Sequence, residues 1–152
     1  MERKEKIVAG AAIGLVLYTL VLAMIGPMVS SALANRTVSN AGSVKAIGVD
    51  VYWDQACTNP VSSINWGTLD PGSNKSTTIY IKNTGNSPIT LAMTTSNWNP
   101  SNASNYMTLI WNYGGQTLNA NEVIQARFTL TVSSNITGIT NFSFDITITA
   151  NE

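Results

Sequence analysis

The chain has 152 residues, of which 44% are hydrophobic, with eight basic and eight acidic side chains and no net charge. This length fits one domain of ordinary size, and the charge balance excludes a nucleic-acid-binding protein, which needs clustered Lys and Arg. The chain has no His and one cysteine, Cys57. His-ligated metal sites, His-based catalytic triads and a disulfide within the chain are therefore excluded.

Residues 1–34 have the composition of an export segment. Met1–Lys6 is mildly positive, and residues 7–25 contain no charge. Gly26-Pro27 ends the expected hydrophobic helix, and Ala32-Leu33-Ala34 has the small-residue pattern of a cleavage site. Together these features predict a signal peptide cleaved after Ala34.

The length of the apolar run leaves two alternatives open. A helix over residues 7–25 covers roughly 28 Å, close to the thickness of a bilayer core, which also suits a retained membrane anchor. A type IV pilin is a third possibility, although Ile7 after Lys6 is not the small residue usual at such a cleavage site. All three predict that the following domain crosses the membrane to the cell surface or the extracellular space.

Beyond residue 34, apolar and polar residues alternate with the period of β-strands. Residues 35–43 are polar and predict a linker, and the domain is expected to span residues 44–152. Its strands are expected at Val44–Trp53, Ile64–Trp66, Thr77–Lys82, Ile89–Met93, Tyr106–Asn112, Val123–Val132 and Phe142–Ile148.

Turn residues separate these strands. Asp70–Ser73 contains Pro71-Gly72 and predicts a type II turn, Gly114-Gly115 predicts a tight hairpin, and Thr95–Asn105 is expected to be a loop. Tyr106–Asn112 has large residues on both faces and is expected to be central in its sheet. About seven strands at this spacing predict an all-β immunoglobulin-like β-sandwich, preceded by the N-terminal hydrophobic helix.

Residues able to carry chemistry are sparse. Nothing indicates a glycosidase carboxylate pair or a base that activates Ser or Thr, so no catalytic, cofactor-binding or metal-binding residue and no enzymatic activity is predicted. Asp50 and Asp54 lack a calcium-loop pattern and are interpreted as solvated acids. Trp98 is a candidate exposed aromatic contact for a glycan. Cys57 is expected to be buried or to pair with another chain.

Five N-x-[ST] sequences are possible N-glycosylation sites in an exported domain. The region beyond residue 34 is rich in Asn, Ser and Thr, so chance alone predicts about four such sites. Their number is therefore no indication of selection. The five asparagines are Asn35, Asn74, Asn102, Asn135 and Asn141.

Two adjacent segments resemble a known group of proteins. WGTLDPGS at Trp66–Ser73 and TIYIKNTGN at Thr78–Asn86 resemble the L-x-P-G, strand, I-x-N-x-G core of export-associated β-sandwiches. TasA/camelysin matrix-fibre proteins and small archaeal cell-surface proteins, including donor-strand filament subunits, share this layout. Ala120-Asn121-Glu122 stands where a second Pro-Gly corner is common.

The resemblance implies a structural subunit of an extracellular filament or matrix that associates with identical subunits. In such filaments the N-terminal segment of one subunit completes the sheet of the next. The alternatives are a first strand paired within its own subunit and, for function, a membrane-anchored extracellular binding module for ligands such as glycans. The candidate donor strand comprises Val44, Ile47, Val49, Val51 and Trp53.

Overall fold

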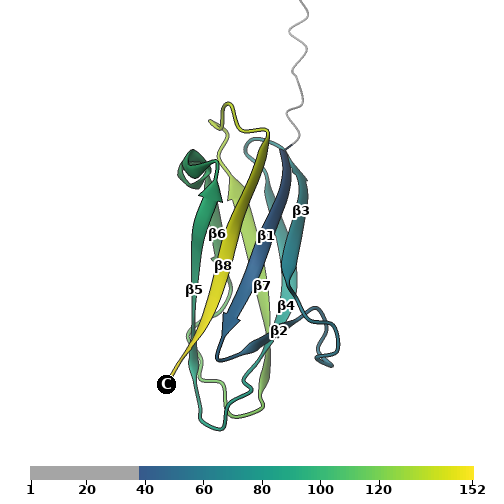
Figure 1. Ribbon diagram of the computed structural model, residues 1–152, viewed down its shortest axis with the longest axis vertical. Helices are drawn as coiled ribbons and strands as arrows, with labels where there is room; N and C mark the ends of the chain where they lie inside the picture. The colour runs from purple at the N-terminus through teal and green to yellow at the C-terminus, as the bar shows by residue number, and fades with distance from the viewer. Residues whose placement is uncertain (1–37) are drawn as a thin grey trace, which may run out of the picture. The chain divides into compact units, whose positions relative to one another are not determined.

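A computed structural model describes residues 38–152, with side chains from residue 41 onward. In this part of the chain, eight strands form two four-stranded sheets (Figure 1). The predicted leader lies outside the described residues. The strands are β1 (Val38–Ile47), β2 (Asp50–Tyr52), β3 (Ser63–Leu69), β4 (Asn74–Lys82), β5 (Thr90–Asn99), β6 (Met107–Trp111), β7 (Val123–Val132) and β8 (Asn141–Asn151), and the 3-10 helix η1 (Ser101–Asn105) lies between β5 and β6.

The two sheets have the orders β3-β1-β8-β5 and β2-β4-β7-β6. Neighbouring strands are antiparallel, except that β1 and β8 run parallel. From β2 to β7, most successive strands alternate between the sheets, so the chain crosses the core repeatedly. The predicted all-β sandwich is thus confirmed.

The core lies between the sheets and follows the alternation of the sequence. Every second residue of β7 and β8 points inward, and Trp66 from β3 is fully buried beside them. Burying each large apolar side chain stabilises the fold by about 1.5–3 kcal/mol. The largest fully buried side chains besides Trp66 are Ile64, Ile79, Ile81, Leu118, Phe128, Leu130, Val132, Phe144, Ile146 and Ile148.

The N-terminal strands differ from the sequence prediction. Residues 38–43, expected to be linker, belong to β1, and the single strand predicted at Val44–Trp53 is divided between β1 and β2 in different sheets. The chain breaks at Gly48, whose φ of 77° suits glycine because it has no Cβ. The polar, glycine-containing sequence of residues 38–43 therefore predicted a linker, whereas the structure has a strand there.

Three other local predictions were wrong, and one is confirmed. The segment Tyr106–Asn112 gives the edge strand β6, whose Ile110 is 55% exposed, instead of a central strand. Residues 112–122 connect β6 to β7, with no tight hairpin at Gly114-Gly115, and β5 continues through the predicted loop to Asn99. The turn at Asp70–Ser73 is confirmed by Gly72, with a φ of 77°, and by the Ser73 N–H donating to the Asp70 carbonyl at 3.1 Å.

The strand registers define two ends of the sandwich. At one end, named the leading pole, β1, β4, β6 and β8 begin and β3, β5 and β7 end, because Val38 pairs with Leu69, Ser39 with Asn141 and Met107 with Val132. At the other end, named the hinge pole, Gly48 joins β1 to β2 and the segments 83–89 and 112–122 connect strands.

Among the described residues, no helix has the length and apolarity needed to cross a membrane.

Candidate functional site: the position of strand β1

Strand β1 occupies an interior position in its sheet although it is the first strand of the domain. It pairs with β3 on one side, over Val38–Ser43, and with β8 on the other, over Ser39–Ile47. Figure 1 shows β1 between β3 and the yellow C-terminal strand β8. This strand and its contacts on β3, β8 and β5 are called the β1 site below.

The inward face of β1 is small. Gly42 is buried, Val44 is half-buried and Ala46 is exposed, and a Cβ placed on Gly42 would lie 3.2 Å from Trp66 Nε1 and 3.4 Å from Ile146 Cδ1. The strand therefore lies close against large side chains of β3 and β8 while contributing little apolar area of its own. Backbone hydrogen bonds to two neighbouring strands are its principal attachment.

The outward face carries a polar cluster that joins three strands. The Ser43 hydroxyl donates to Asp145 Oδ1, and the Asn97 side chain donates to Asp145 Oδ2 at 2.7 Å. These two hydrogen bonds, from Ser43 first and Asn97 second, lower the pKa of Asp145 against a smaller opposing effect of desolvation, with Lys45 adding to the decrease. The cluster favours one register between β1 and β8, because a shifted strand would separate Ser43 from Asp145.

The cluster makes the stability of the fold depend on pH. The folded pKa of Asp145 lies below its unfolded value, so its contribution is complete above the ordinary aspartate pKa of about 3.9 and is lost as the pH falls through the folded pKa. We expect Asp145→Asn to lower the urea midpoint at neutral pH and to match the unsubstituted protein in strong acid. Asp54 titrates in both proteins and cancels from the comparison. A midpoint difference that stays constant through this range would contradict the assignment.

The last residues of β1 are open on one side. Strand β3 begins opposite Ser43, so beyond the bond from the Val44 N–H to the Ser62 carbonyl, residues 45–47 have β8 as their neighbouring strand. Ile47 is 47% exposed at this open edge. A pocket of about 320 Å³ lies beside the end of β1 and is lined by Val44, Ala46, Asp50, Val51, Tyr52, Pro60 and Val61.

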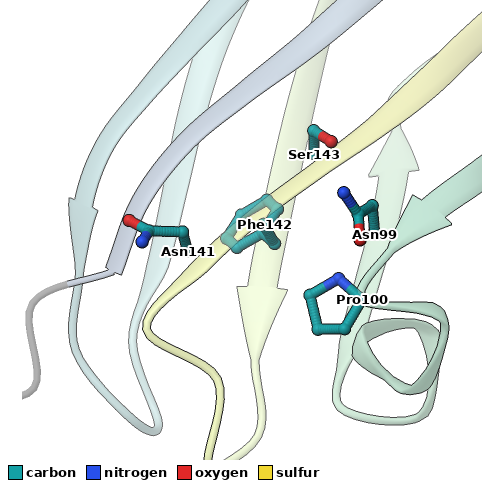
Figure 2. A pocket seen from close by; sticks show the side chains of 5 residues that line it. All are labelled: Asn99, Pro100, Asn141, Phe142 and Ser143. Carbon is teal, nitrogen blue, oxygen red and sulfur yellow. The ribbon is translucent and has the colours of Figure 1, made fainter.

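A second pocket lies at the leading pole. It has a volume of about 300 Å³ and is formed where β5 ends against the start of β8. Figure 2 shows Asn99 and Pro100 on one side of β8 and Asn141 on the other, beside the start of β1. Its lining residues, Asn99, Pro100, Asn141, Phe142 and Ser143, include no ionisable side chain.

The predicted donor residues do not share one face. Val49 and Val51 are buried, whereas Ile47 is exposed and Val44 and Trp53 are half-buried. Val44 and Ile47 lie in β1, and Val51 lies in β2 of the opposite sheet. The alternation of apolar residues in the sequence runs through the turn at Gly48 and so spans two strands. Because these strands belong to opposite sheets, residues that alternate regularly in the sequence do not lie on one face.

Trp98 is not the exposed contact that the sequence predicted. It lies near the end of β5, half-buried, and its ring stacks on Phe144 with centroids 4.1 Å apart and planes 6° apart. The irregular pairing of β5 with β8 between Ser96 and Asn99 accompanies this inward position. A face covered by Phe144 is not open to a sugar ring.

The two acids considered for calcium accept hydrogen bonds from nearby residues, Asp50 within β2 and Asp54 within the loop that follows it. The Tyr52 hydroxyl donates to Asp50 Oδ2 at 3.2 Å, and Asp54 accepts the N–H of Asn59 at 2.7 Å and that of Thr58 at 3.2 Å. Desolvation raises the pKa of Asp54, but hydrogen bonds from Asn59, Thr58 and Ala56 together outweigh it and lower the pKa. Within residues 38–152, no group of three or more potential ligands is placed to hold a metal ion.

Cys57 lies in the same loop and is half-buried and unpaired in the described part of the chain. Its φ is 57°, and its thiol donates to the Gln55 carbonyl at 3.7 Å.

The sequence reasoning missed the Ser43, Asn97 and Asp145 cluster. No local motif marks it, because its members come from three strands and meet only through their register.

Comparisons with known proteins find similarity only among solved structures. No family model and no curated protein matches the chain. Among solved structures it is similar to the ASH/PapD-like domain of human CEP192 (PapD-like domain 7), with a TM-score of 0.36 and 6% identity over 84% of this chain and 95% of that one. Function therefore has to be inferred from the residues of the chain itself.

Proposed function

We propose that the protein is a non-enzymatic structural subunit at the cell surface, and that its copies join by exchanging strand β1. One observation carries the proposal: the first strand of the domain lies inside a sheet, between β3 and β8, and is joined to the next strand only by Gly48-Val49. The export-type sequence of residues 1–34 supports the location outside the cell.

Exchange requires that β1 of one copy can make, in a second copy, every contact that it makes in its own subunit. Removing β1 would expose unpaired N–H and C=O groups on both β3 and β8, which an incoming strand of the same sequence would pair again. Because the inward side chains of β1 are small, the core of the accepting copy needs little repacking. The Ser43 to Asp145 hydrogen bond favours the same register for the incoming strand. A swapped element of this kind forms intersubunit contacts at low cost.

The parallel pairing of β1 with β8 also suits exchange. A hairpin partner is held next to its neighbour by a short turn, whereas 93 residues separate the end of β1 from the start of β8 and 15 separate it from β3. Only the link through Gly48-Val49 to β2 holds the end of β1 near its own body. An extended link would carry β1 to another copy without unfolding the other seven strands.

A disulfide between β1 and β3 tests strand exchange directly. Ala41 and Asn65 are direct partners in the antiparallel pair and are both exposed, so cysteines there lie within reach of a disulfide. In the full chain carrying Ala41→Cys, Asn65→Cys and Cys57→Ser, recovered from the cell surface and oxidised, we expect a ladder of covalent multimers on non-reducing gels. Each bond would then join two copies.

A second cysteine pair provides the control. Ser76 and Thr129 face each other on β4 and β7, with their hydroxyl oxygens 2.8 Å apart, and both strands stay in one copy during exchange. Ser76→Cys with Thr129→Cys should therefore give only single-chain species from the same assemblies. Single-chain species from the Ala41 and Asn65 pair as well would overturn the proposed exchange.

A further inference from the structure

Four of the five N-x-[ST] asparagines lie within the described residues, and all four are at the leading pole. Asn74 begins β4 and Asn141 begins β8. Asn102 lies in η1, directly after β5 ends, and Asn135 follows the end of β7. The fifth, Asn35, lies outside the described residues.

The distribution of all asparagines does not explain this gathering. The hinge pole also has asparagines, on the segments 83–89 and 112–122 and at the end of β8, but none has Ser or Thr two residues later in an acceptor sequence. The number of acceptor sequences is the number expected by chance. Within the described residues, however, all of them lie at the leading pole and none lies at the hinge pole. The hinge-pole asparagines are Asn83, Asn86, Asn112, Asn119, Asn121 and Asn151.

The acceptor asparagines have exposed side chains, and they differ from a second group of asparagines whose side chains take part in hydrogen bonds. All four are exposed, and within the described residues their side-chain amides make no hydrogen bond, so each Nδ2 atom is free to react. Five other asparagine side chains make hydrogen bonds within the fold, as in the donation from Asn83 to Ser87 or from Asn97 to Asp145. Asparagines with such bonds are Asn65, Asn83, Asn97, Asn112 and Asn119, and none is in an acceptor sequence.

We infer that the leading pole is the glycan-bearing end of the protein, with N-linked oligosaccharides on Asn74, Asn102, Asn135 and Asn141. At each site, Nδ2 forms a bond to C1 of a sugar and the bond from C1 to the phosphate of a lipid-linked oligosaccharide donor breaks. The lipid phosphate leaves, and a base of the transferase takes the amide proton. The inference rests on the proposed function, because only an exported chain meets such a donor.

Strand exchange places this pole away from the contact between subunits. In an exchanged pair, Ile47 ends in the acceptor and Asp50 begins β2 in the donor, with only Gly48 and Val49 between them. Three Cα–Cα steps span at most about 11 Å, so the hinge poles of the two copies lie close together. Oligosaccharides at the opposite pole leave this junction free and cover the outward ends of the subunits.

The modification is tested on the full chain recovered from the surface of its own host. Glycopeptide mass spectrometry is expected to find sugar on two or more of the four asparagines, and each Asn→Gln variant at an occupied site should remove one glycan mass from the intact protein. Sugar on none or only one of the four would overturn the glycan-bearing pole. This measurement requires no filament, so its outcome is separate from that of the disulfide experiment.

The orientation of the poles is tested by labelling. Single cysteines from Asn86→Cys at the hinge pole and Asn102→Cys at the leading pole, each with Cys57→Ser, are exposed positions for a polyethylene glycol maleimide. Both should react in the separated subunit, whereas in assembled material labelling is expected to be lost at residue 86 and kept at residue 102. Equal labelling of both positions in assembled material, or loss at residue 102 alone, would overturn the orientation.

Discussion

Replacing Asn83 with alanine is expected to lower the free energy of unfolding by about 3 kcal/mol, because each buried polar group that loses its partner costs about 1–3 kcal/mol. Asn83 is fully buried at the end of β4. Its amide nitrogen lies 2.8 Å from the Ser87 carbonyl oxygen and 3.1 Å from those of Leu118 and Asn119. Its Oδ1 accepts the Gly85 N–H at 2.9 Å.

The amide has two N–H groups for three carbonyls, so one hydrogen is shared between two of them. Alanine removes the partner of the Ser87 carbonyl and of the Gly85 N–H, whereas the Leu118 and Asn119 carbonyls keep the N–H donors of Ile89 and Glu122. The backbone bonds of residue 83, to the Glu122 carbonyl and from the Asn121 N–H, do not depend on the side chain and remain in the variant. The expected loss therefore measures the side chain alone, which ties segment 83–89 to segment 112–122.

Urea unfolding at neutral pH measures this effect. Asn86→Ala is the matched control, because Asn86 is exposed in the same segment and surface substitutions usually change the free energy of unfolding by less than about 0.5 kcal/mol. An Asn83→Ala protein as stable as the Asn86→Ala protein would show that solvent replaces the lost partners, and the proposed role of Asn83 would be wrong.

The strands that sequence reasoning located correctly are those with large inward side chains. In β7 and β8, Phe128, Leu130, Phe144 and Ile146 alternate with polar residues, and burial of one face imposes this period. In β1 the inward residues include Gly42 and Ala46, which give no apolar signal. The strand is held by backbone hydrogen bonds that any sequence can make, so its position was invisible to a reading of hydrophobicity.

The polar features of the structure depend on residues far apart in the chain. Asn83 contacts carbonyl groups 35 and 36 residues away, and Ser43 reaches Asp145 across 102 residues. Local preferences explain an asparagine at residue 83 only as a turn residue, because turns favour Asn for local reasons. Likewise the acceptor asparagines were recognised one by one, but their gathering at one pole follows from strand registers, which only the folded chain defines.

Replacing Gly42 with valine is expected to lower the free energy of unfolding by about 2 kcal/mol, within the 1–3 kcal/mol that overpacking usually costs. A Cβ alone would already lie 3.2 Å from Trp66 Nε1, 3.4 Å from Ile146 Cδ1 and 3.6 Å from Phe144 Cζ. The two methyl groups of valine extend beyond this Cβ, so β1 must move away from the core or the rings beneath it must shift.

The neighbouring residue provides the control for this prediction. Ala41 lies on the exposed face of the same strand, where valine suits a β-strand, so Ala41→Val should change the free energy of unfolding by no more than about 0.5 kcal/mol. An exchanged β1 lies against the same Trp66 of another copy, so Gly42→Val added to the Ala41 and Asn65 cysteine pair should also shorten the covalent ladder. A Gly42→Val protein as stable as Ala41→Val would contradict the close packing of β1, and a loss of stability with an unchanged ladder would show that an exchanged β1 does not pack against Trp66 of the other copy.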